Sequence, residues 1–178
     1  ERITTSARRL FAERGYDRTT IRAVASAAGV APALVGRYYP SKSVLFFASM
    51  PEVVGLESVS VGDVASLPER VARYFVGQWE DPQQSEPLHT WIRAAATDPD
   101  ASSRLAELVD EHTIRPLASA LSDATDPCEP WLLSALLVGT AYLRYVIGVE
   151  DLAAIPHGRL EQSLIDAMQR LIGDSEDG

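Results

Sequence analysis

The fold of the first part of the chain is decided by the stretch TTIRAVASAAGVAPALVGRYY, residues 19–39. Thr19 or Thr20 can cap a helix in which apolar residues recur at helical spacing. Gly29 gives the backbone the freedom that a tight turn requires, and Pro32 suits the first turn of a following helix. Two short helices joined by such a turn are typical of a helix-turn-helix.

One further helix is predicted on each side of this pair. Pro40 breaks the second helix of the pair, and Ser41 can cap a fourth helix over residues 42–50. The helix before the pair ends at Gly15, which lies just beyond its last turn. Its apolar face is formed by Ile3, Ala7, Leu10 and Phe11. The first fifty residues are therefore predicted to form an all-helical head.

Charge is distributed unevenly over the 178 residues. The net charge of the whole chain is −9, which does not by itself indicate a polyanionic partner. Residues 1–50 carry eight basic and three acidic side chains, a net charge of +5, whereas the net charge of residues 51–178 is −14. A basic head on an acidic body indicates a polyanion as the partner of the head alone.

Two segments of the head resemble the DNA-binding domain of the tetracycline-repressor (TetR) family of bacterial transcriptional regulators. They are ARRLFAERGYDRTTIRAVASAAGV, residues 7–30, and YYPSKSVL, residues 38–45, which is similar to that family's His-Phe-x-x-Lys-x-x-Leu ending. The resemblance covers residues 3–48 and implies that helix 32–39 reads the major groove of double-stranded DNA. The contact residues that it implies are Thr20, Arg22, Pro32, Ala33, Leu34, Arg37, Tyr38 and Lys42.

The recognition helix departs from the family pattern at two positions. Gly36 stands where the family usually has a phosphate-contacting Tyr, and Ala31 replaces the usual Ser or Thr cap. Few polar base readers remain, so Arg37 is the candidate for a bidentate contact with guanine, while Leu34 can pack on a thymine methyl group. Lys42, at the start of a helix, is expected to bind a backbone phosphate.

The rest of the chain predicts an all-helical body. Its helices are expected over residues 68–80, 87–97, 101–121, 130–149 and 157–172. Pro116 should kink or split the third of them. Residues 57–64 alternate weakly as a strand would, and we interpret them as part of a linker.

The helix 130–149 carries more apolar surface than a small body can bury. Ala135 and Gly139, four residues apart, make a smooth strip for the approach of another helix. Together with the final helix it can form a four-helix bundle with a second copy, as in the resembling family, so that two heads read a palindrome. The candidate interface residues are Trp131, Leu132, Ala135, Leu136, Gly139, Leu143, Leu164 and Met168. Alternatively, both helices only close a monomer core.

Aromatic residues of the body cluster on its first two helices and can line an apolar cavity for a small-molecule effector. The candidate pocket residues are Phe47, Met50, Tyr74, Phe75, Trp79, Leu88, Trp91, Leu108, His112 and Tyr142. A ligand bound there would lower DNA affinity by favouring one of two states. The alternative for each aromatic side chain is packing in the core. The predicted domains are thus a helix-turn-helix DNA-binding domain, 1–48, and a helical ligand-binding and dimerisation domain, 49–178.

Other classes of function lack their motifs. Cys128 is the only cysteine, which excludes an intramolecular disulfide and a Cys-rich zinc site. We expect no metal and no cofactor. We also expect no enzyme activity, because no nucleophile elbow, phosphate-binding Gly loop or His-Glu-x-x-His motif is present.

A membrane partner is not expected either. Residues 131–149 are long enough to cross a bilayer, but they contain Arg144 and have acidic flanks, so we interpret them as a helix of a soluble protein. Residues 1–9 are not followed by an apolar run, so no signal peptide is expected. A single cysteine fits the reducing cytoplasm, and the family resemblance implies that the cell is bacterial.

We therefore predict a ligand-responsive, homodimeric transcriptional repressor. The alternative is a helical small-molecule carrier whose head no longer reads DNA, motivated by Gly36 and the apolar recognition helix. A helical enzyme is a third possibility, against which the missing catalytic motifs argue. Sequence-selective, salt-dependent DNA binding would separate the first hypothesis from the second.

Overall fold

The computed structural model describes residues 1–50, 55–121 and 128–173. Within these ranges every regular element is a helix, which confirms the predicted all-α class. The chain divides into two compact units. The head unit comprises Glu1–Glu52 and Pro87–Leu105, and the body unit comprises Val53–Glu86 and Ala106–Gly178.

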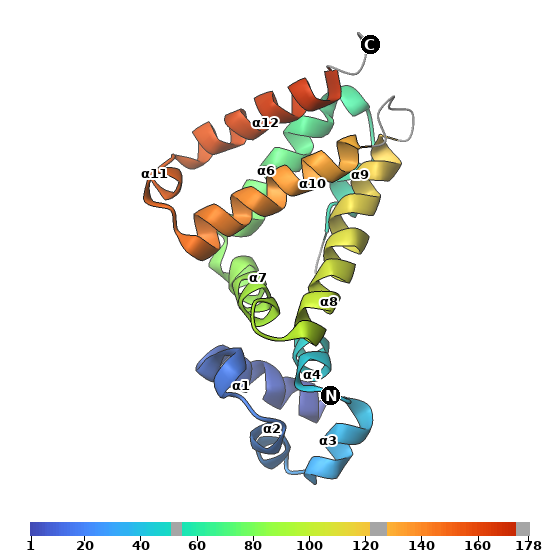
Figure 1. Ribbon diagram of the computed structural model, residues 1–178, viewed down its shortest axis with the longest axis vertical. Helices are drawn as coiled ribbons and strands as arrows, with labels where there is room; N and C mark the ends of the chain where they lie inside the picture. Colours follow the sequence, from blue (N-terminus) through green and yellow to red (C-terminus); the bar gives the residue numbers. More distant parts are fainter. Residues whose placement is uncertain (51–54, 122–127, 174–178) are drawn as a thin grey trace. The chain divides into compact units, whose positions relative to one another are not determined.

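The head unit begins with four helices, which Figure 1 shows in blue to cyan: α1 (Arg2–Arg18), α2 (Ile21–Ala28), α3 (Pro32–Tyr38) and α4 (Lys42–Ser49). The helix-turn-helix pair is α2 and α3, as the sequence predicts. Gly29 ends α2 in the left-handed region, with φ 66° and ψ 41°, which favours glycine over residues with a Cβ. Gly15, with φ 77°, interrupts α1, but the helix resumes and extends to Arg18 rather than ending there.

Side-chain caps fix where two of these helices begin. The Thr20 hydroxyl oxygen accepts the backbone N–H of Ala23 at 3.1 Å at the start of α2. The Ser41 hydroxyl oxygen accepts the N–H of Val44 at 3.2 Å at the start of α4. Each cap satisfies a backbone donor that the helix itself leaves unpaired, which is worth about 1 kcal/mol. Both predicted caps are confirmed.

An aromatic cluster holds the head together. The Phe11 and Phe46 rings meet edge to face with centroids 4.8 Å apart, and the Tyr16 ring lies 5.1 Å from that of Phe46. All three side chains are buried, as are Val24 of α2 and Val35 of α3. Burying each large apolar side chain contributes roughly 1.5–3 kcal/mol, so this core stabilises the packing of α1 on α4 and α2 and of α2 on α3.

Parts of α7 (Pro82–Ala95) and α8 (Pro99–Val109) complete the head unit. The predicted start of α7 at Pro87 is wrong, because the helix begins five residues earlier with Pro87 inside it. Pro82 occupies the first turn, where a missing N–H costs nothing, and Pro87 removes a single internal hydrogen bond without ending the helix.

In the body unit, α6 (Leu67–Glu80) packs against α12 (His157–Gly173), and α10 (Glu129–Ala141) packs against α9 (Arg115–Ala120) and α12 (Figure 1). A short helix, α11 (Glu150–Ala153), precedes α12. The core between these helices includes Leu67, Val71, Ala72, Phe75, Leu117, Leu133, Leu137, Leu160, Leu164 and Met168.

Two predicted body helices are interrupted by π-helical turns. The segment expected as one helix over 101–121 is helical throughout, but α8 gives way to the π-helix Asp110–Ile114 before α9, which has Pro116 in its first turn. The helix expected over 130–149 is regular only to Ala141 and continues as the π-helix Tyr142–Ile147. The backbone stays helical from Val109 to Arg115, so a kink or split at Pro116 stays a prediction. No residue type in the second segment signals its change to a π-helix.

The predicted linker 57–64 is wrong in part, because the structure forms a short helix there, α5 (Glu57–Ser60), followed by a 3-10 turn, Val64–Ser66. The N–H of Leu56 donates to the carbonyl of His112 at 2.9 Å, and Ser60 is buried. Four residues are too few to show helical periodicity, so only the packing of α5 on α6 and α9 stabilises it.

Candidate nucleic-acid interface and body surfaces

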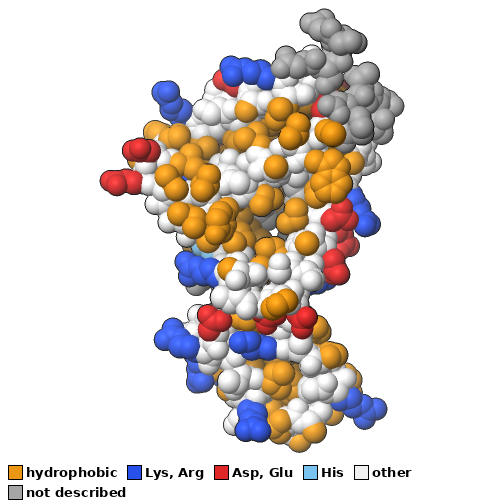
Figure 2. Space-filling model, in the orientation of Figure 1, with side chains coloured by type: hydrophobic (Ala, Val, Ile, Leu, Met, Phe, Trp, Pro, Cys, Tyr) orange, Lys and Arg blue, Asp and Glu red, His pale blue; other side chains and the backbone are white. Residues whose placement is uncertain are grey.

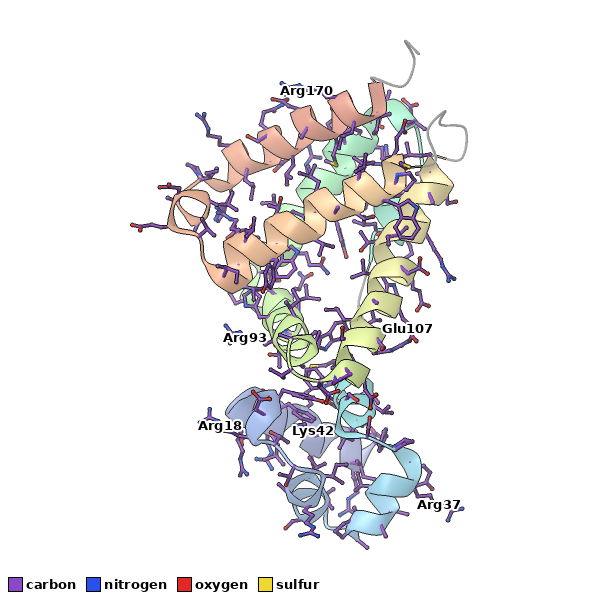
Figure 3. The ribbon with its side chains drawn as sticks, in the orientation of Figure 1. Arg18, Arg37, Lys42, Arg93, Glu107 and Arg170 are labelled. Atoms are coloured by element: carbon purple, nitrogen blue, oxygen red, sulfur yellow. The ribbon has the colours of Figure 1, made fainter. Side chains whose placement is uncertain are left out.

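Helix α3 presents most of its surface to solvent. Val35 is its one buried residue, and the exposed ones are Pro32, Ala33, Leu34, Gly36, Arg37 and Tyr38. Arg37 points away from the helix in Figure 3, and Tyr38 is 64% exposed. Among the described residues, no atom beyond the helix's own backbone and the two neighbours of Gly36 lies within 4 Å of the position that a Cβ on Gly36 would take, so this side of α3 is open. A helix anchored by one residue and exposed elsewhere can enter a groove of matching width.

The predicted contacts on α2 lie beside this surface in sequence and are also exposed. The Thr20 oxygen accepts a hydrogen bond as the cap of α2, which leaves its hydroxyl hydrogen able to donate to a phosphate oxygen. Arg22 is exposed in the first turn of α2. Both groups stand at a helix N-terminus, where the backbone dipole also favours an anion.

Several other basic side chains of the head bond within it. Arg2 donates to the carbonyl of Ala28 at 2.7 Å, and Arg8 donates to that of Ser49 at 2.6 Å. Arg9 forms an exposed ion pair with Glu13. The positive charge of the head is therefore partly structural, and Arg22 and Arg37 are better placed to meet an external partner.

Lys42 lies against α1 rather than in open solvent. Its Nζ atom donates to the carbonyl oxygen of Tyr16 at 3.2 Å and sits 4.1 Å from the centroid of the Tyr16 ring. The Tyr16 hydroxyl in turn donates to Oδ2 of Asp98 at 2.5 Å. Burial, and then this carboxylate, raises the pKa of Tyr16, while the Tyr16 hydroxyl holds the pKa of Asp98 below its usual range. Sequence reasoning missed both Tyr16 and Asp98, which are 82 residues apart.

The predicted effector-pocket residues fall into separate groups. In the head unit, Phe47 and Trp91 meet edge to face at 5.4 Å; in the body unit, the Phe75 and Trp79 rings are 6.2 Å apart. Trp79 also stacks on Tyr145 at 5.3 Å, a partner that the sequence did not indicate. The remaining candidates are divided between the head unit (Met50 and Leu88) and the body unit (Tyr74, Leu108, His112 and Tyr142).

Two of the predicted pocket residues in the body unit do not line an apolar cavity with the other candidates. Nδ1 of His112 lies 2.6 Å from Oε1 of Glu57, and Tyr142 is exposed on the outside of the body. A shallow depression of about 550 Å³, beside α5 and α9, is lined by other residues, among them Glu111 and Arg115.

A polar network surrounds the one charge of the apolar segment, Arg144. This buried guanidinium donates to Oε1 of Glu80 at 3.2 Å and to the carbonyl of Ala153 at 3.1 Å. The Tyr145 hydroxyl donates to the same Glu80 oxygen at 2.8 Å, and His157 approaches the other oxygen at 2.8 Å. Burial, followed by Glu80, raises the pKa of Tyr145 to about 12. Compensation by several partners makes a buried charge tolerable in this otherwise apolar helix.

The outer face of α10 and the π-turn after it is a continuous apolar surface. Figure 2 shows hydrophobic side chains gathered over this element. Of the predicted interface residues, Trp131 (58% exposed), Leu132, Ala135 and Leu143 are exposed, and Leu136 and Gly139 are half-buried. The exposed surface also includes Val138, Tyr142, Ile147 and Val149. We call this set the α10 face.

The structure places the other two predicted interface residues in the core. Leu164 is 3% exposed and Met168 is 1% exposed, because this side of α12 packs on α6 and α10. They have no surface to offer a partner, and their assignment to an interface is corrected. Within the described ranges, Glu129–Ile147 is also long and apolar enough to cross a membrane, a criterion that the core helix of a soluble protein meets as well.

Comparison with known proteins identifies both parts of the chain. Residues 3–49 match the model of bacterial regulatory proteins of the tetR family, and residues 65–172 match the tetracyclin repressor-like C-terminal domain. The chain belongs to the TetR family. It is therefore a DNA-binding transcriptional regulator, and the recognition made from residues 3–48 is confirmed.

Solved structures agree with this assignment. A TetR-family regulator from Streptomyces coelicolor is 30% identical, with a TM-score of 0.66, and the alignment covers 97% of this chain and 93% of that one. The multidrug-binding protein EbrR, complexed with proflavin, shares the fold at 23% identity and a TM-score of 0.68, over 96% and 98% of the two chains. SmeT, in complex with triclosan, does so at 19% identity and a TM-score of 0.65, over 94% and 88%. No curated protein matches the chain significantly.

Proposed function

We propose that this TetR-family regulator is a repressor that binds a palindromic operator as a homodimer and leaves it when a small molecule binds the body. The observation that carries the proposal is the coexistence of two unlike surfaces. One is the exposed recognition helix α3 on a basic head; the other is the α10 face on an acidic body.

The head supports the DNA part of the proposal. Its exposed Arg37 has the fork of donors that suits the O6 and N7 atoms of guanine, and exposed Leu34 suits a thymine methyl group. Thr20, Arg22 and Lys42 stand at the starts of α2 and α4, where helix N-termini favour phosphates. We assign base reading to α3 and backbone binding to these helix starts.

The α10 face supports the dimer. Soluble monomers seldom leave so many large apolar side chains exposed on one element, and a second copy of the same face would cover them. A dimer carries two recognition helices, and dimeric helix-turn-helix proteins bind half-sites separated by about 34–36 Å, one turn of DNA. The operator would then be palindromic.

The third part of the proposed function is the chemical class of the effector. Proflavin and triclosan, found with two relatives, are both aromatic. The body unit of this chain contains the aromatic group Phe75, Trp79 and Tyr145, where flat rings can stack. We therefore propose an aromatic, largely apolar effector that binds the body and favours the state of the protein with lower DNA affinity.

Selection of binding sites from random duplex DNA by the full chain tests the proposal. We expect an inverted repeat to be enriched, and its affinity to fall steeply as salt is raised. Aromatic compounds, beginning with proflavin and triclosan, are then added to the complex with the selected duplex, and release is followed by fluorescence anisotropy.

Each part can fail separately. Enrichment of a single, unrepeated half-site would contradict the dimer. An absence of any enriched sequence at low and moderate salt, together with tight binding of an aromatic compound, would favour the carrier alternative over the repressor.

A further inference from the structure

Lys42 is the only lysine in the chain, and it is the residue to which the proposed function gives a phosphate contact at the start of α4. A free lysine side chain is flexible and loses considerable rotamer entropy when it is fixed on a phosphate. The position of Nζ before DNA arrives therefore affects the affinity.

Two features of Tyr16 restrain this ammonium group. The Tyr16 carbonyl oxygen accepts one of its hydrogens at 3.2 Å, and the ring lies beneath it at 4.1 Å. These contacts occupy two directions around Nζ and leave a third N–H able to donate to a phosphate. The ring itself is fixed by stacking with Phe11 at 5.9 Å and by its edge contact with Phe46.

Asp98 fixes the far end of the same ring. Its Oδ2 atom accepts the Tyr16 hydroxyl at 2.5 Å, while its Oδ1 atom accepts the N–H of Ala101 at 3.1 Å in the first turn of α8. The carboxylate is thus held by a helix start and by a buried phenol. A hydrogen bond to a carboxylate also shifts electron density toward the ring, which strengthens the attraction of the ring for a cation.

We propose that Asp98 is a positioning residue for DNA binding: through the Tyr16 hydroxyl and ring, it holds the ammonium group of Lys42 ready for a backbone phosphate. The proposal rests on the phosphate role of Lys42 given above. It assigns a DNA-binding role to the segment 87–105, which lies far from the helix-turn-helix in the sequence but within the head unit.

The pKa directions agree with this arrangement. The pKa of Asp98 is lowered first by the Tyr16 hydroxyl, next by the N–H of Ala101 and, among smaller causes, by the charge of Lys42. The carboxylate therefore stays ionised at neutral pH, and its charge is felt at Lys42 as well as at Tyr16.

A double-mutant cycle tests the proposal. Tyr16→Phe and Asp98→Asn are each measured for binding to duplex DNA in the natural chain and in the Lys42→Ala background. Asn can still cap α8, and Phe keeps the ring, so both variants remove little besides the hydrogen bond to the carboxylate. We expect each to weaken binding about three- to tenfold when Lys42 is present, the effect of one net hydrogen bond, and less than about twofold when it is absent. Asp100→Asn, which removes the same charge two residues away, is the matched control.

The outcomes distinguish the phosphate contact of Lys42 from the positioning role of Asp98. If Lys42→Ala alone leaves DNA affinity unchanged, the phosphate role assigned to Lys42 is wrong. If Lys42→Ala weakens binding but Tyr16→Phe and Asp98→Asn have the same effect with and without Lys42, only the positioning role is overturned.

The single lysine also provides a spectroscopic measurement that a loss of stability would not mimic. Labelling with lysine carrying ¹³C at Cε gives one side-chain resonance, and the Tyr16 ring should shift its protons upfield. We expect Asp98→Asn to move this resonance toward the value of free lysine while the thermal melting temperature stays close to that of the Asp100→Asn control. An unchanged resonance in Asp98→Asn would overturn the proposal independently of DNA.

Discussion

Two exposed helices, α3 in the head unit and α10 in the body unit, face solvent for different reasons. Helix α3 is held by one buried residue, Val35, and belongs to the segment of net charge +5. Helix α10 contributes half of its side chains to a core and exposes a row of large apolar ones, in a segment of net charge −14. The first surface fits a polyanion, and the second fits another apolar protein surface.

Exposure of a helix therefore does not by itself identify its binding partner. The attraction of α3 for its partner is mainly electrostatic and is weakened by salt, whereas burial of the α10 face is driven by the hydrophobic effect, which salt does not screen. The acidic body would also be repelled by DNA, which leaves DNA contact to the heads.

The largest expected effect comes from placing a charge on the α10 face. Leu132→Glu should raise the dimer dissociation constant by about 100-fold or more, because a buried, unpaired carboxylate costs several kcal/mol. Analytical ultracentrifugation measures the change, and operator affinity should fall with it. Val64→Glu, which puts the same charge on an exposed valine of the body unit outside α10, is the control. A Leu132→Glu protein that remains dimeric would remove the proposed distinction between the two helices.

The second effect concerns base reading by α3. Arg37→Ala should lower affinity for the selected operator by about 10- to 100-fold while changing affinity for random DNA much less, since a bidentate contact with guanine is worth roughly 1–3 kcal/mol. Competition gel shifts with the two duplexes measure this ratio. An equal loss on operator and random DNA would reassign Arg37 to the phosphate backbone.

A smaller and uniform effect is expected at the start of α4. Lys42→Ala should weaken binding to operator and random DNA alike, by about tenfold or less at moderate salt. The slope of log affinity against log salt concentration should fall by about 0.9, the value for one phosphate contact. Isothermal titrations at four salt concentrations give the slope. The dimer dissociation constant should be insensitive to this change, which sharpens the contrast with α10.

The smallest effect is on the stability of the head as a function of pH. Because the pKa of Asp98 is lowered in the folded protein, its contribution is fully present above the ordinary aspartate pKa of about 3.9 and is lost as pH falls through the lower, folded value. The difference in free energy of unfolding between the natural chain and Asp98→Asn should therefore shrink below about pH 4. Urea titrations at pH 6, 5, 4 and 3 measure it. A difference that stays constant down to pH 3 would show that the carboxylate charge contributes nothing.

Much of the head could be predicted because its determinants are local. Thr20, Gly29 and Ser41 act on backbone groups within three or four residues of themselves, so caps and turns appear directly in the residue order. The predicted contact residues Leu34 and Arg37 are exposed because α3 has only seven residues and packs on the head through Val35, so its other faces remain in solvent. Whether they touch DNA stays a prediction.

The all-helical class, the helix-turn-helix with its family, and the apolar character of α10 thus follow from the residue order alone. The burial of Leu164 and Met168 in the core does not, because an apolar stripe does not say which neighbouring helix covers it. The tertiary structure also decides which groups surround Arg144, and it brings Asp98 to Tyr16 across 82 residues. Short-range hydrogen bonds are written into neighbouring positions, whereas burial and long-range polar contacts arise only when separate helices pack together.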